Sequence, residues 1–235
     1  MSTKNEIVSL TNVIKNYGNG KVITKALQGI DLKINQGDFS VMMGPSGCGK
    51  STMLNIIGGL DKATSGEVKF DGKDFNSLTN KELSIIRRNQ IGFVFQNYNL
   101  LPVLTAYENA EYVLMLQEMP ISQRKEKVMH FFKEMGLDGL ENRLPRELSG
   151  GQQQRVAIAR AVVSDPLLVL ADEITANVDS ETAQSLLLLM EKLNKINKTT
   201  FLISTHDPAV IKFAKKVIVL KDGRIDKEEL SSENI

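Results

Sequence analysis

Residues Gly44 to Ser51 have the types and the spacing that bind the phosphates of a nucleotide. They read Gly-Pro-Ser-Gly-Cys-Gly-Lys-Ser and match the pattern G-x-x-x-x-G-K-[ST] at every fixed position. Glycines let backbone N–H groups curl around phosphate oxygens, Lys50 can reach the β- and γ-phosphates, and the Ser51 hydroxyl can hold Mg²⁺. The pattern predicts a site for a nucleoside triphosphate.

The segments on either side of this loop are those that a phosphate site requires. Phe39–Met43 is typical of a strand and Thr52–Ile57 of a helix, which Gly58-Gly59 ends. Free N–H groups and the positive end of the dipole at that helix start attract a phosphate. A chance glycine turn is the alternative, and the ordered context argues against it. The nucleotide contacts expected from this segment are Gly44, Ser46, Gly47, Cys48, Gly49, Lys50, Ser51 and Thr52.

Polar residues follow three further apolar segments that are typical of buried strands. They are Gln96, the pair Asp172-Glu173, and His206. Ligands of open α/β sheets bind outside the carboxyl ends of the strands, so parallel strands would bring these groups and the phosphate loop to one crevice. The strands expected before these residues are Ile91–Phe95, Leu167–Ala171 and Thr200–Thr205.

The chemistry of these groups suits phosphoryl transfer to water. Asp172 is expected to hold Mg²⁺ together with the Ser51 hydroxyl, and Glu173 to polarise the attacking water. Gln96 can orient water or ligate Mg²⁺ through its amide oxygen, and His206 can donate a hydrogen bond to the γ-phosphate. A polar strand cap, a solvated acidic pair and a structural histidine are the alternatives. The expected metal ligands are Ser51, Gln96 and Asp172, and the expected catalytic residues are Lys50, Gln96, Glu173 and His206.

A second helix start with glycines follows at Ser149-Gly150-Gly151-Gln152. A hydroxyl and bare N–H groups at a helix N-terminus form another anion site. The phosphate loop lies about a hundred residues earlier, and one nucleotide rarely needs two such sites from one chain. We therefore expect the second site to bind a nucleotide held by another subunit, with an ordinary helix start as the alternative.

Alternating strand and helix patterns predict an α/β fold with a mostly parallel sheet. Strands expected at Ile7–Val13, Leu27–Ile34 and Glu67–Phe70 form a small antiparallel layer. Capping-box signatures at Thr79 and Thr105 predict helices, and residues after about 98 are helical without a strand pattern. We expect one domain over 1–235, with a core at 1–97 and 153–235 and an inserted helical subdomain at about 98–152.

Composition excludes several classes of function. The net charge is +1, from 29 basic and 28 acidic side chains, which gives no support to a nucleic-acid surface. A single cysteine cannot form an internal disulfide, so a reducing compartment is consistent. The polar amino terminus lacks the pattern of a signal peptide, and the apolar runs are too short to span a bilayer. We expect a soluble chain whose membrane role, if any, comes through another subunit.

From about Val8 to Ile225 the chain resembles the ATP-binding subunits of ABC transporters. The phosphate loop matches the Walker A motif, Leu148–Gln152 the signature motif and Leu168–Asp172 the Walker B motif. This resemblance implies a P-loop NTPase with a RecA-like core. It also implies MgATP binding between two copies, hydrolysis coupled to transport, transmembrane permease partners, and a peripheral location at the cytoplasmic face of the membrane.

The same resemblance assigns roles to single residues. Glu173 matches the catalytic glutamate, Gln96 the Q-loop and His206 the switch histidine. Asp179 matches the D-loop, and Tyr17 the aromatic residue that stacks on adenine. A narrower likeness, to lipoprotein-releasing and macrolide- or peptide-exporting ATPases, is carried by the stretches Gly58–Lys62 and Ile91–Glu108, and bacitracin-type and cell-division ATPases look similar.

Ile174 and Cys48 have particular consequences for the expected chemistry. Family members usually carry proline after the catalytic glutamate, and Ile174 there leaves the turn freer, so we expect looser geometry with hydrolysis retained. Cys48 lies near a helix N-terminus, which can lower a thiol pKa and predicts labelling that blocks ATP binding and that MgATP prevents. A soluble ABC-type ATPase not coupled to transport, a GTPase switch and a non-hydrolysing subunit are the alternatives.

Overall fold

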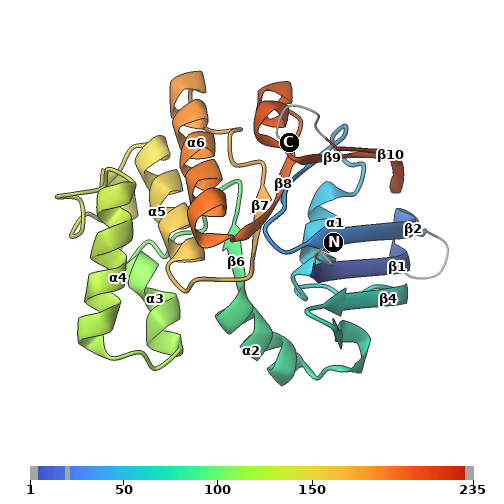
Figure 1. The fold of residues 1–235 in the computed structure, drawn as a ribbon, viewed down its shortest axis with the longest axis horizontal. Coiled ribbons are helices and arrows are strands. Elements are labelled where there is room, and N and C mark those ends of the chain that lie inside the picture. Colours follow the sequence, from blue (N-terminus) through green and yellow to red (C-terminus); the bar gives the residue numbers. More distant parts are fainter. Residues whose placement is uncertain (1–4, 19–21, 231–235) are drawn as a thin grey trace.

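The computed structural model describes residues 5–18 and 22–230, and a sheet of six strands runs through its centre (Figure 1). The strand order is β10-β9-β3-β8-β7-β6. All neighbours from β9 to β6 pair in parallel, and β10 alone pairs antiparallel, with β9. The α/β class with a mostly parallel sheet is confirmed. The strands are β3 (Phe39–Met43), β6 (Ile91–Val94), β7 (Leu168–Asp172), β8 (Thr200–Thr205), β9 (Lys216–Lys221) and β10 (Arg224–Leu230).

A second sheet is antiparallel, in the order β2-β1-β4-β5. The first two strands are longer than the sequence predicts. The added residues, 14–17 of β1 and 24–26 of β2, do not show the regular alternation of apolar and polar residues by which a strand is recognised. The ladder continues to the pairs Asn16↔Lys25 and Tyr17↔Thr24. This extension places Tyr17 at the end of a strand. The strands are β1 (Glu6–Tyr17), β2 (Thr24–Asn35), β4 (Ser65–Phe70) and β5 (Lys73–Asp74).

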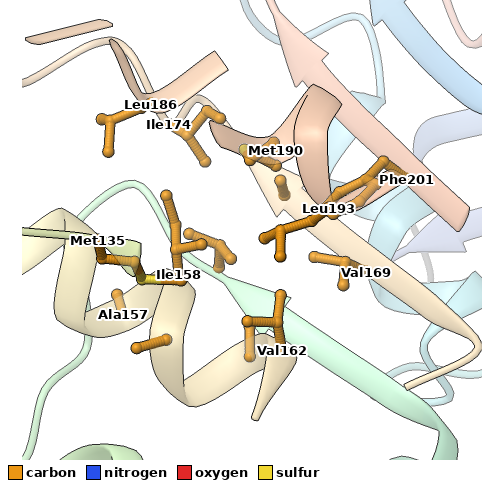
Figure 2. Packing of buried hydrophobic residues seen from close by; sticks show 14 of the residues in the cluster. Met135, Ala157, Ile158, Val162, Val169, Ile174, Leu186, Met190, Leu193 and Phe201 are labelled. Atoms are coloured by element: carbon orange, nitrogen blue, oxygen red, sulfur yellow. The ribbon is translucent and has the colours of Figure 1, made fainter. Parts of the chain in front are cut away.

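Apolar side chains fill both faces of the central sheet. Val169 and Phe201 belong to the cluster on one face, which includes α5 (Gly150–Val162) and α6 (Ser180–Asn197) (Figure 2). Leu170 and Leu202 belong to the cluster on the other face, which is shared with the antiparallel sheet. Helix α1 (Lys50–Ile57) packs against strands of both sheets, so the helix that begins in the phosphate loop is held from two sides.

Helices α3 and α4 lie on the side away from the antiparallel strands, and α2 lies below β6, between these helices and the antiparallel strands (Figure 1). Both predicted capping boxes are present, at Thr79 before α2 and at Thr105 before α3. Residues 98–149 contain no strand. Whether this part is a separate subdomain stays a prediction, because one apolar cluster joins it to the sheet. The helices are α2 (Asn80–Gln90), α3 (Ala106–Leu116), α4 (Ile121–Glu134) and the short 3₁₀ turns η1 (Phe75–Ser77), η2 (Pro145–Glu147) and η3 (Pro208–Phe213).

Candidate active site

The phosphate loop connects β3 to α1 and needs glycine at defined places. A Cβ on Gly44 would lie 2.2 Å from the carbonyl oxygen of Leu220, and one on Gly49 would lie 2.6 Å from that of Ala26. Gly49 also has a φ of +109°, which side chains of L-residues disfavour. The loop therefore fits between β9 and β2 only because these positions carry no side chain.

Lys50 is folded back over the loop. Its Nζ donates to the carbonyl oxygens of Gly44 at 2.7 Å and Pro45 at 3.2 Å, and it lies 3.7 Å from Glu173 Oε1. The residue is only 7% exposed, so these oxygens replace the water that a buried ammonium group needs. Phosphate oxygens of a nucleotide can replace these carbonyl oxygens as acceptors with only a small movement of the Lys50 ammonium group.

A cavity of about 630 Å³ opens beside the loop. Residues that follow β3, β6, β7 and β8 line it, which confirms that the four strand ends converge on one site. The antiparallel sheet forms another part of the wall. The predicted residues that line the cavity are Tyr17, Ser46, Gly47, Gly49, Lys50, Ser51, Thr52, Gln96, Glu173 and His206.

Three lining residues were not predicted from the sequence. They are Thr24, Lys25 and Ala26, the first three residues of β2, which form part of the cavity wall. The β-branched run Val22-Ile23-Thr24 is a strand signal that could have extended the predicted strand to this point. Lys25 is exposed and adds a positive charge to a cavity that already contains Lys50.

Glu173 and His206 are in direct contact within the cavity. The distance between Glu173 Oε2 and His206 Nδ1 is 2.8 Å. The Glu173 backbone has a φ of +49°, an uncommon conformation for a residue other than glycine, and its N–H donates to the Ser204 carbonyl at 3.0 Å. A carboxylate held by a histidine in this way can take a proton from a water molecule.

The turn after Glu173 is held by packing. Ile174 is 2% exposed and lies in the cluster that also contains Leu186 of α6 (Figure 2). The N–H of Ala176 donates to the Glu173 carbonyl at 3.1 Å. A buried side chain thus restrains the turn that proline restrains in the family pattern. The effect of Ile174 on turnover stays a prediction.

The helix start at Ser149 lies outside this cavity. Ser149 caps α5, since its Oγ accepts from the Gln152 N–H at 3.3 Å and its own N–H donates to Gln152 Oε1 at 2.9 Å. A Cβ on Gly151 would lie 2.7 Å from the Thr182 methyl carbon, so the turn packs against the first turn of α6. Asp179 caps α6, and its hydrogen bonds from Thr182 lower the pKa of its carboxyl. Ser149, Gly150, Gly151, Gln152 and Asp179 are all absent from the cavity lining.

Comparison with known proteins identifies the family. Residues 27–176 match the family described as ABC transporter, which is more than half of the chain. The chain belongs to the ABC transporter family. It is an ATP-hydrolysing subunit, and its relatives include ATPases of the macrolide and peptide exporter branch.

An uncharacterized ABC transporter ATP-binding protein of Methanocaldococcus jannaschii, MJ0796, is 46% identical over 95% of this chain and 97% of that protein. A solved structure titled as a dimeric post-hydrolysis state of MJ0796 bound to ADP and Pi has a TM-score of 0.90 and covers 95% of this chain and 98% of that chain. The bacitracin export protein BceA of Halalkalibacterium halodurans is 38% identical over 93% of this chain and 87% of that protein. The macrolide exporter MacB of Syntrophobacter fumaroxidans is 41% identical over 95% of this chain, which spans 32% of that protein.

The oxygen donors of this ABC ATPase fit Mg²⁺. Ser51 and Gln96 line the cavity, and Asp172 precedes Glu173, with Oδ1 accepting the Ser204 hydroxyl. Mg²⁺ is bound by few protein oxygens together with substrate phosphates. The described residues contain no group of three or more His, Cys, Asp or Glu that could hold a metal ion. Within the same residues, no helix has the length and apolar character needed to cross a membrane.

Cys48 does not face the nucleotide cavity. It is 5% exposed, and a Cβ on Gly44 would lie 2.7 Å from its Sγ, so the thiol packs beneath the loop in the apolar cluster. This burial contradicts an accessible thiol, because the loop turns the side chain toward the core, and the labelling of Cys48 stays a prediction. Gly44 is likewise absent from the lining, and any nucleotide contact of Cys48 stays a prediction for its backbone.

We expect the buried thiol to react slowly. A maleimide reagent should modify Cys48 at least about tenfold more slowly in the folded protein than in urea, because the reaction requires local opening. The rate is followed by mass spectrometry, with Ser77→Cys in a Cys48→Ala background as the exposed control. Equal rates in the two conditions, with protection by MgATP, would restore the prediction made from sequence.

Proposed function

We propose that this chain is the ATPase of an exporter and works as a pair of identical copies that enclose two MgATP molecules. Separate transmembrane permease subunits would use the energy to export or release a lipoprotein, peptide or drug-like substrate. The observation that carries the proposal is the separation of two helix starts that have the glycine pattern of phosphate sites. Lys50 lies in the cavity, whereas Ser149 lies at the start of α5, outside it.

The dimer follows from this separation. The described lining of the cavity contains the phosphate loop, Glu173 and His206, and none of its residues belongs to the start of α5. A second copy that presents its Ser149 turn would close the cavity and add N–H groups and a helix dipole to the phosphates. The MJ0796 structure, at 46% identity, is titled as dimeric and bound to ADP and Pi, which supports a pair of copies.

Charge placement explains the chemistry. Lys50 would neutralise the β- and γ-phosphates, and Ser51, Gln96 and Asp172 would hold Mg²⁺, which supplies further neutralisation when bound. Glu173 would orient and deprotonate the attacking water, while its contact with His206 keeps the carboxylate in place. Positioning and electrostatic stabilisation of this kind provide most of the rate enhancement in phosphoryl transfer.

Glu173→Gln tests the catalytic role. The amide keeps the size of the side chain but cannot accept a proton, so phosphate release should fall by about 10²- to 10⁴-fold. ATP binding should persist, and the ATP-bound pair should accumulate on gel filtration. Lys50→Ala is the matched control that should lose binding as well. Turnover at the rate of the unmodified protein would remove Glu173 from its role.

The segment after Gln96 offers a surface for the permease. Leu101 is 41% exposed and Val103 is 82% exposed, whereas Leu100 packs against the core. Asn109 is 1% exposed and fixes this segment, because its Oδ1 accepts from the Leu101 N–H at 2.7 Å and its Nδ2 donates to the Leu104 carbonyl at 3.0 Å. Apolar side chains displayed on a rigid segment suit a partner helix. Docking here would hold the ATPase at the cytoplasmic face of the membrane.

Val103→Glu tests this surface. The substitution puts a charge where an apolar partner would pack, so binding of the ATPase to membrane vesicles from the source cells should fall by about tenfold. The rate of ATP hydrolysis by the isolated variant should stay within about twofold of the unmodified protein, because Val103 is mostly exposed and does not pack in the core. Leu188→Glu, at an exposed position of α6, is the matched control. Undiminished vesicle binding by Val103→Glu would exclude the surface.

A further inference from the structure

Three side chains meet behind the wall of the cavity where Tyr17 lies. The Tyr17 hydroxyl donates to Asp61 Oδ2 at 2.7 Å. Lys15 Nζ donates to Asp61 Oδ1 at 2.6 Å and to the Lys62 carbonyl at 2.8 Å. The same ammonium group lies 4.7 Å from the centroid of the Tyr17 ring, a cation–π contact. The ring is therefore held at its hydroxyl and along one face.

This cluster is partly removed from water. The Lys15 side chain is 11% exposed and that of Asp61 is 29% exposed, so their ion pair is screened less than one on the open surface. Burial opposes the charge of Asp61, yet hydrogen bonds from Lys15, Tyr17 and the Lys62 backbone hold the pKa of its carboxyl below the ordinary value. Burial and the contact with Asp61 raise the pKa of Tyr17, which keeps its hydroxyl protonated as a donor.

The cluster is also tied to the phosphate loop. Asp61 follows α1, and its backbone N–H donates to the Asn55 carbonyl in the last turns of that helix at 3.1 Å. Helix α1 starts at Lys50, has 8 residues and spans about 12 Å. Because α1 is packed between two sheets, the position of the Tyr17 ring relative to the phosphate loop is set by a rigid element.

The free face of the ring is available to a ligand. Tyr17 is 40% exposed and lines the cavity, and Lys15 lies over one face of its ring. Among the lining residues that the structure describes, it supplies the only phenyl-type ring. With the phosphates at the loop, a purine base in the same cavity would find its flat apolar partner here.

We propose that Asp61 and Lys15 are positioning residues that hold the Tyr17 ring as a preformed platform for the base of the nucleotide. The inference rests on the proposed function as an ATP-binding chain and on the expectation from the sequence that Tyr17 stacks on the base, and it deepens that role. A ring that is already fixed loses little conformational freedom when the base stacks on it, so the cluster contributes to affinity for the nucleoside. It contributes nothing to the affinity for the phosphates, which Lys50 and the loop hold.

The test compares ATP with a ligand that has no base. The KM for ATP should rise about 3- to 10-fold in Asp61→Asn and in Tyr17→Phe, with kcat changed by less than about twofold. Inorganic tripolyphosphate, used as a competitive inhibitor, should keep its inhibition constant in both variants. Asp138→Asn, at an exposed position outside the cluster, is the matched control, and thermal unfolding of each variant confirms that it folds.

A double-mutant cycle decides between positioning and general destabilisation. Once the ring is removed in Tyr17→Ala, a further Asp61→Asn substitution should leave the KM for ATP unchanged. Equal weakening of ATP and tripolyphosphate in Asp61→Asn would overturn the inference, because the phosphate site would then be affected too. A raised KM in Tyr17→Ala with unaltered KM in Asp61→Asn and Tyr17→Phe would overturn the positioning role alone. An unchanged KM in Tyr17→Ala would overturn both this inference and the role of Tyr17, while Lys50→Ala still tests the nucleotide site.

Discussion

The parallel pairing of β3, β8, β7 and β6 is the constraint on which the site depends. Its register sets Asp172 opposite Ser204, so the Ser204 hydroxyl reaches the Asp172 carboxylate and the Ser204 carbonyl accepts the N–H of Glu173. These contacts bring Glu173 to His206 and, through β3 and its loop, to Lys50. A slip of one residue would turn every side chain of a strand to the opposite face and separate these groups. The chemistry is therefore a consequence of backbone hydrogen bonding within the sheet.

The antiparallel sheet supports the phosphate-loop helix and completes the cavity wall. It covers α1 from the side opposite the central sheet and places Tyr17 and Thr24 at the cavity wall. The ends of the parallel strands thus supply Lys50, Gln96, Glu173 and His206 to the cavity, and the antiparallel strands supply the wall with Tyr17 and Thr24–Ala26. Because α1 packs against both sheets, the two halves of the cavity cannot shift independently. This rigidity suits a protein whose catalysis depends on the exact placement of charge around a phosphate.

Local signals in the sequence predicted most of this structure, and long-range pairing explains the remainder. The phosphate loop and the capping boxes depend on neighbours within a few residues, and they were predicted correctly. The direction of Cys48 depends on packing against β9 and the hairpin that follows it, where the Gly223 N–H donates to the Cys48 carbonyl. The wall formed by Thr24–Ala26 and the link from Asp61 to Tyr17 arise only when distant segments meet. A local strand signal exists for Thr24, but the sequence carries no direct signal for the segments that these residues meet.

The central claim is that the phosphate loop of one copy and the Ser149 helix start of another bind one ATP together. Mixing two inactive variants tests it most directly. Lys50→Ala removes the loop lysine, and Ser149→Arg blocks the facing helix start, so each pure protein should be inactive. A mixture of equal amounts should regain up to about a quarter of the activity, because half of the pairs contain one intact site out of two. Full activity of Ser149→Arg alone, or a mixture that pairs but stays as inactive as its components, would contradict the account.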